Sequence, residues 1–100
     1  MTKQEIFRAI QDRGGDRAEV WFSGGEDEGG ANFIALWKGN KVVENLSSLL
    51  HETKDLKEKQ FVETLCDPIE YEFHGFAGRP LIIGKLIWTC NDHKVSMDWC

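Results

Sequence analysis

The chain has 100 residues, 41% of them hydrophobic, and a formal net charge of -5. This length is typical of one domain, so we expect a single unit over residues 1–100, and the apolar share is too high for a disordered chain. The acidic balance argues against direct binding of nucleic acid, which needs a basic footprint, and favours a protein partner with a basic surface.

The first predicted element is a helix over residues 2–13. Thr2-x-x-Glu5 has the spacing of a capping box, in which the hydroxyl and the carboxylate each accept a bond from the other residue's backbone N–H. The pair Gly14-Gly15 is expected to end the helix, because glycine adopts the left-handed cap conformation without steric cost.

Two aromatic and apolar runs, residues 18–23 and 31–37, flank seven residues that are all glycine or acid. The runs predict strands, because branched and aromatic side chains fill a pleated surface. The middle, residues 24–30, predicts a flexible acidic loop, since its four glycines and three carboxylates suit neither a strand nor a helix interior. The second run is apolar on both faces, which predicts a central strand that is covered on both sides.

Gly39-Asn40 predicts a tight turn, followed by a short strand over 41–44. A helix is expected over about 56–66, after a break near residues 53–55, and Asp67-Pro68 is expected to stop it.

The last third of the chain predicts strands only. Residues 69–73 alternate apolar and polar side chains, as a half-exposed strand does, and two further strands are expected over 81–90 and 95–99. The order is thus α-β-β-β-α-β-β-β. It predicts an α+β fold, with an antiparallel sheet of five or six strands and helices packed on one face.

The predicted partner-binding surface is acidic. Strand geometry would put Glu70 and Glu72 on one face, about 7 Å apart. Near the acidic loop they would form a negative patch, with Trp21 as an aromatic anchor, because Trp21 is expected on the strand face opposite its two apolar neighbours. The alternative for Trp21 is packing beneath helix 56–66. The candidate residues are Glu26, Asp27, Glu28, Glu70, Glu72 and Trp21.

No complete metal or catalytic motif is present, so we expect no cofactor and no enzyme activity. The acidic loop lacks the ligand spacing of the known calcium loop, and its charge opposes a phosphate. Cys90-x-x-His93, joined with other cysteines and histidines such as His51, lacks the paired Cys-x-x-Cys of a zinc site. Three cysteines, an odd and irregular set, indicate reduced thiols and a cytoplasmic protein.

The stretch from Phe22 to Gly29 resembles a motif of a family of small, uncharacterised bacterial and phage domains. In that family an aromatic strand end runs into Gly-x-Gly-Asp-(Ser or Glu)-Gly. Glu26 stands where the family has glycine, and residues 75–78 are similar to a later glycine-aromatic turn. The resemblance covers about a third of the chain and implies a small α+β domain carried on mobile or phage DNA. The matching residues are Phe22, Gly24, Asp27, Glu28 and Gly29.

These features favour a non-enzymatic acidic binding protein, a monomer or small homo-oligomer with no membrane contact. Our hypothesis is a phage-encoded inhibitor of the anti-CRISPR or anti-restriction type. It would act as a nucleic-acid mimic in the host bacterial cytoplasm, docking on the basic, nucleic-acid-binding surface of a defence complex. The alternatives are a small metal-dependent hydrolase that uses the acidic glycine-rich loop, and a homo-oligomeric assembly module that pairs through a β edge.

Overall fold

The computed structural model describes residues 1–50 and 54–100 of the chain. The candidate zinc ligand His51 and part of the predicted break near residues 53–55 lie outside the described residues. The elements in chain order are α1 (Lys3–Asp12), β1 (Arg17–Gly25), β2 (Glu28–Lys38), β3 (Lys41–Asn45), η1 (Ser47–Leu50), α2 (Leu56–Phe73), η2 (His74–Phe76), β4 (Ile82–Thr89) and β5 (Lys94–Trp99).

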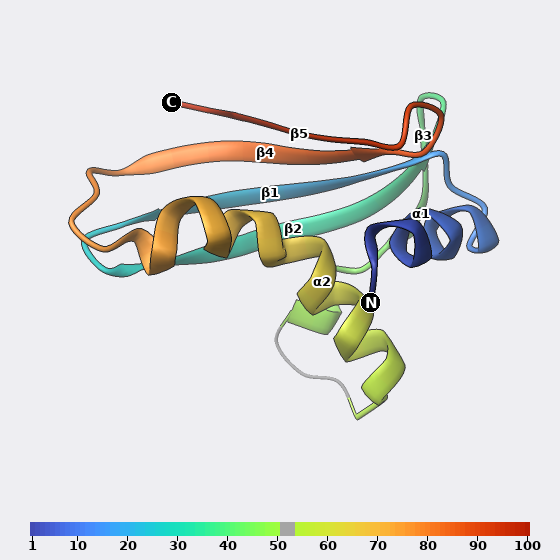
Figure 1. Ribbon diagram of the computed structural model, residues 1–100, viewed down its shortest axis with the longest axis horizontal. Helices are drawn as coiled ribbons and strands as arrows, with labels where there is room; N and C mark the ends of the chain where they lie inside the picture. The colour runs from blue at the N-terminus through green and yellow to red at the C-terminus, as the bar shows by residue number, and fades with distance from the viewer. Residues whose placement is uncertain (51–53) are drawn as a thin grey trace.

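The strands form one antiparallel sheet in the order β3-β2-β1-β4-β5 (Figure 1). This confirms the α+β class and an antiparallel sheet of five strands, in the element order α-β-β-β-η-α-β-β. β2 lies between β3 and β1, so residues 31–37 do form an inner strand, but the prediction that this strand is covered on both faces is wrong. Phe33 and Trp37 of β2 lie on the face away from the helices and are half-buried.

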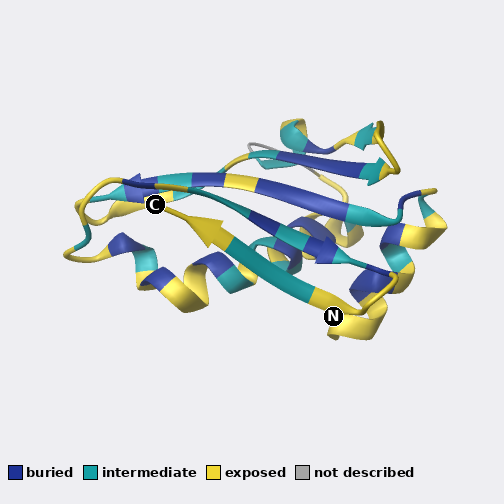
Figure 2. Cartoon of the chain, turned by 90° about the horizontal axis from the view of Figure 1, so that it is seen from above, coloured by how far each residue is buried: buried dark blue, intermediate teal, exposed yellow. Residues whose placement is uncertain are grey.

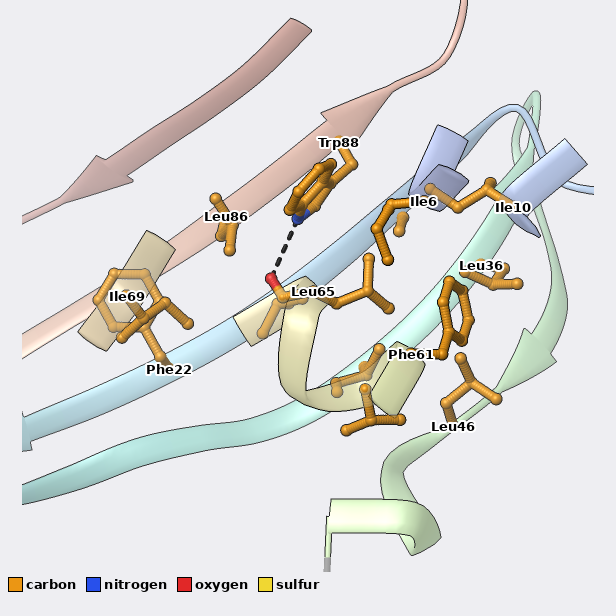
Figure 3. Packing of buried hydrophobic residues seen from close by; sticks show 14 of the residues in the cluster. Ile6, Ile10, Phe22, Leu36, Leu46, Phe61, Leu65, Ile69, Leu86 and Trp88 are labelled. Carbon is orange, nitrogen blue, oxygen red and sulfur yellow. Dashed lines mark hydrogen bonds between the residues drawn. The ribbon is translucent and has the colours of Figure 1, made fainter. Parts of the chain in front are cut away.

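Both helices lie below the sheet in the view of Figure 1. The pleat of β1 turns Val20 and Phe22 toward them, 0% and 1% exposed, while Trp21 points to the other face and is 43% exposed. In Figure 3 the Trp88 indole points at α2, where its Nε1 donates to the backbone carbonyl of Leu65 at 3.0 Å. The core cluster includes Ile6, Phe7, Ile10, Phe22, Leu36, Phe61, Leu65, Ile69, Phe73, Leu86 and Trp88.

The predicted strand over 69–73 is wrong, because α2 continues through Pro68 to Phe73. Leu65, Ile69 and Phe73 are spaced by four residues and are all buried, so helical packing fixes this segment. Pro68 has no N–H for the carbonyl four residues earlier, and Figure 1 shows α2 as two limbs that meet at an angle. None of the described helices combines the length and the apolar character that a membrane crossing needs.

Candidate functional site

The acidic stretch is the tip of a β-hairpin and not the predicted flexible loop of residues 24–30. β1 continues to Gly25, which pairs with Glu28 at the start of β2. Only Glu26 and Asp27 turn the chain, with φ of 53° and 71°. Two successive left-handed residues match the twist of the hairpin strands, and aspartate tolerates this conformation better than most residues. The three carboxylates therefore lie at the end of the sheet, where β1 turns into β2.

Two glycines of this hairpin, Gly24 and Gly29, make room for the ring of Phe76. Phe76 is 1% exposed, and its ring lies directly against the hairpin backbone. A Cβ at Gly24 would lie 2.6 Å from the ring of Phe76, and a Cβ at Gly29 would meet the same ring at 2.6 Å. Phe76 also stacks on Phe73, with ring centroids 5.1 Å apart. The two glycines thus let a buried aromatic ring reach the backbone of the hairpin.

Hydrogen bonds tie the hairpin tip to the segment after α2. The backbone N–H of Glu26 donates to the carbonyl of Arg79 at 3.0 Å, and that of Asp27 donates to the carbonyl of Phe76 at 3.1 Å. The backbone N–H of Gly78 donates to Oδ1 of Asp27 at 3.2 Å. Asp27 therefore has a structural role, whereas Glu26 and Glu28 present exposed side chains.

Glu70 and Glu72 belong to the C-terminal turns of α2, so their placement on one strand face is wrong. Two residues on a helix are about 200° apart, and these side chains diverge while both stay exposed. The carbonyl end of a helix carries partial negative charge, so carboxylates there are not compensated by the helix dipole. In α2, which is described throughout, the last turn carries no basic residue.

The structure nevertheless brings the five predicted carboxylates to one end of the molecule. α2 ends at Phe73, and the next residues, 74–79, run to the hairpin tip and bond to it. Figure 1 shows the end of α2, this connection and the β1–β2 turn together at the left. We call this region the acidic end and define it as Glu26, Asp27, Glu28, Glu70 and Glu72.

Trp21 does not lie at the acidic end. It sits in the middle of β1 on the open face of the sheet, paired with Phe33 and Lys85. The Lys85 ammonium lies 4.9 Å from the centre of the indole ring. The alternative that Trp21 packs beneath the helix is wrong, because the helices cover the other face.

The open face also holds a set of ion pairs that the sequence did not predict. Glu19 is 6% exposed and pairs with the guanidinium of Arg17 at 2.9 Å and with the ammonium of Lys85 at 3.9 Å. The Arg17 guanidinium lies 5.0 Å from the ring of Trp37. The signal was available in Arg17, Glu19 and Trp21, because strand residues spaced by two share a face.

Metal-ligating side chains do not cluster in the described part of the chain: it contains no group of three or more His, Cys, Asp or Glu that could hold an ion. Cys66 is half-buried, Cys90 is buried and Cys100 is exposed, and the three thiols are free. Burial raises the pKa of Cys66 to about 12, with a further contribution from Asp67. Burial also raises the pKa of Cys90, with Asp16 as the second cause.

We expect the thiols to differ sharply in reactivity. Iodoacetamide at pH 8 should modify Cys100 quickly and the other two slowly, since only about one in ten thousand Cys66 thiols is ionised there. Three thiols should react after unfolding without reductant, and a count of one would reveal a disulfide.

Because folded Cys66 holds its proton more tightly than the unfolded chain does, the free energy of unfolding should fall as the pH rises above about 9. Mass spectrometry and denaturant titration measure both effects.

Comparisons with protein-family models, curated proteins and solved structures found no match to this chain. The resemblance to small bacterial and phage domains therefore stays a prediction from the motif.

Proposed function

We propose that the protein is a non-enzymatic binding protein whose acidic end docks on a basic surface of another protein. The observation that supports this most is that two separate segments, which together carry five exposed carboxylates, lie at the same end of the fold (Figure 1). Like charges at one end of a molecule project a field that steers an oppositely charged partner and speeds association.

The arrangement of these charges adds a physical argument. Glu70 and Glu72 lie at the negative end of a helix dipole, where a cation would relieve the repulsion. Arg79 also lies at this end of the molecule. Its guanidinium is 5.4 Å from the ring centre of Phe73 and so contacts a core side chain. Lysine and arginine side chains of a partner would supply the missing compensation.

The narrower hypothesis concerns the target. Surfaces that bind nucleic acid carry arginine and lysine for the phosphates, so carboxylates spaced on a rigid end can compete for them. A phage-encoded inhibitor that docks on the nucleic-acid-binding surface of a bacterial defence complex fits this chemistry. The small size and net charge of -5 support it.

The test reverses charge in two pairs and keeps Asp27, which bonds to Gly78. A partner captured from bacterial lysate would be titrated with the variants Glu26→Lys/Glu28→Lys and Glu70→Lys/Glu72→Lys. We expect each pair to cost on the order of 2 kcal/mol in binding at low salt and to slow association. The loss should shrink as salt screens the attraction. Melting temperatures should change little, because exposed charges contribute little to stability.

A matched control makes the same charge change at the opposite end of the molecule. Asp12 at the end of α1 and Asp92 in the β4–β5 turn are both exposed. The variant Asp12→Lys/Asp92→Lys should bind within about twofold of wild type. If the acidic-end reversals bind as tightly as this control, the acidic end is not the docking site.

A further inference from the structure

The edge strand β5 offers unpaired backbone groups. Ile83 and Cys100 exchange both of their backbone hydrogen bonds, at 3.2 and 3.1 Å. In an antiparallel ladder such hydrogen-bonded pairs alternate with pairs whose backbone N–H and C=O groups point away from the partner strand. The N–H and C=O groups of Val95, Met97 and Trp99 therefore point away from β4, out of the sheet. Figure 2 shows this strand at the sheet edge, with no buried residue along it.

The side chains of the same three residues line a groove between β5 and α2. They lie on the helix side of the sheet, because their register partners on β4 include the core residues Trp88 and Leu86. The groove has a volume of about 920 Å³. Trp88 contributes to its floor. This volume is in the range of sites that hold an organic ligand or several side chains.

The described edge lacks the backbone features that block pairing with another strand, although β5 carries the charged side chains of Lys94 and Asp98. Natural edge strands are commonly protected by proline, a bulge or very short length. β5 has six residues and no proline, and its register with β4 runs without a shift. The opposite edge strand, β3, does have a register shift against β2, between Leu36 and Trp37.

The groove's charge favours a basic occupant. Its α2 side carries the carboxylates of Asp67, Glu70 and Glu72, which outnumber the ammonium groups of Lys3 and Met1 in the lining, where His74 also lies. A second copy of the chain paired through β5 would bring the same acidic wall close to its own, which is unfavourable. A partner segment with lysine or arginine would instead meet opposite charge.

We propose that the groove binds an extended, basic segment of another protein, which adds a strand to the sheet along β5. The segment would bond to the outward backbone groups of Val95, Met97 and Trp99. Alternate side chains of an extended segment lie on one face, so its lysines or arginines would all enter the groove. Their aliphatic stems would lie against the apolar lining, their cations would approach Asp67 and Glu70, and the residues between them would lie on the open face. The inference rests on the proposed function only in taking the partner to be a protein. The sign of the partner's charge comes from the carboxylates of the groove itself, and the binding mode comes from the edge geometry.

A synthetic peptide of four Val-Lys repeats, capped at both ends, tests the proposal on the full chain. Calorimetry should give a Kd on the order of 10 μM, and a peptide with glutamate in place of lysine should bind at least about tenfold more weakly. Two further peptides would be N-methylated, one on every valine and the other on every lysine, so that only one of them is blocked at the edge that faces β5. The peptide blocked at that edge should lose at least about tenfold in affinity, and the other peptide should bind like the parent. Equal effects of the two methylations, or no binding of the parent peptide, would overturn the proposal.

The variant Met97→Pro supplies the test from the protein side. Its lost N–H points out of the sheet, so the β4–β5 ladder keeps its bonds, while an added strand loses one. Peptide affinity should fall at least about tenfold without a loss of the folded circular-dichroism spectrum. If this variant does not fold, the methylated peptides still test the same contact on the wild-type protein. A concentration-dependent dimer that the peptide dissociates would overturn it, because the edge would then belong to a second copy.

Failure of the two proposals can be told apart. The variant Glu26→Lys/Glu28→Lys changes residues outside the groove, so it should bind the peptide within about twofold of wild type. If this variant binds the peptide like wild type, and captured partners bind the acidic-end variants as tightly as wild type, the groove proposal is supported and the proposed function is wrong. If a peptide of Val-Thr repeats binds as tightly as the lysine peptide, the basic preference of the groove is overturned.

Discussion

Replacing Gly24 by alanine should lower the free energy of unfolding by about 2–3 kcal/mol, near the upper range for overpacking a core. The new methyl group would lie 2.6 Å from the ring of Phe76. That ring cannot move aside easily, because it is buried and stacks on Phe73 at 5.1 Å. For a domain of this size the melting temperature should fall by about 10–20 °C, measured by circular dichroism.

Gly30 provides the matched control on the same hairpin. A Cβ there would meet nothing within 4 Å. Gly30→Ala should therefore change the free energy of unfolding by less than about 0.5 kcal/mol. In a Phe76→Leu background the cost of Gly24→Ala should drop by at least about 1 kcal/mol, since contacting residues couple. Equal costs for the two glycine substitutions would contradict the packing role assigned to Phe76.

This hairpin illustrates why the sequence predicted the acidic residues but not their setting. Glycine next to carboxylates was interpreted as flexibility, which is a local property. The actual reason for Gly24 is Phe76, 52 positions later in the sequence. A contact of that range leaves no local pattern, so neither the length of the turn nor its packing against Phe76 could be predicted.

The prediction of a strand over 69–73 is wrong for a different reason. Ile69 and Phe73 fit both a period of two and a helical spacing of four, and only Leu65 before them distinguishes the two. Pro68 then favoured a break, although a helix tolerates proline when tertiary packing holds both limbs. The capping box of Thr2 and Glu5, by contrast, is confirmed because it depends on local spacing alone.

The groove between β5 and α2 could not be predicted from the sequence. Its floor and edge are set by the β1–β4 and β4–β5 registers, which order β4 and β5 at one side of the sheet. Alternation predicted that Val95, Met97 and Trp99 share a face. It could not predict that α2 stops short of covering that face.

Trp88→Ala should be the most destabilising single change on this side of the sheet, costing about 3–5 kcal/mol out of a total of roughly 5–15 kcal/mol. The side chain is 2% exposed and meets Phe7 edge to face, with ring centroids 5.6 Å apart. Its Nε1 also donates to the carbonyl of Leu65 and so fixes α2 to β4. Trp88→Phe keeps an aromatic ring and loses this hydrogen bond, so it should cost about 1–2 kcal/mol.

Trp21→Ala is the control for this tryptophan, because it removes an indole that is 43% exposed on the opposite face. It should cost less than about 1 kcal/mol in urea titrations. Peptide binding to the groove should survive Trp21→Ala and weaken in Trp88→Phe, since Trp88 contributes to the floor. If Trp21→Ala destabilised the protein as much as Trp88→Ala, the open face would have to be a second core. The separation of helix-covered and open faces would then be wrong.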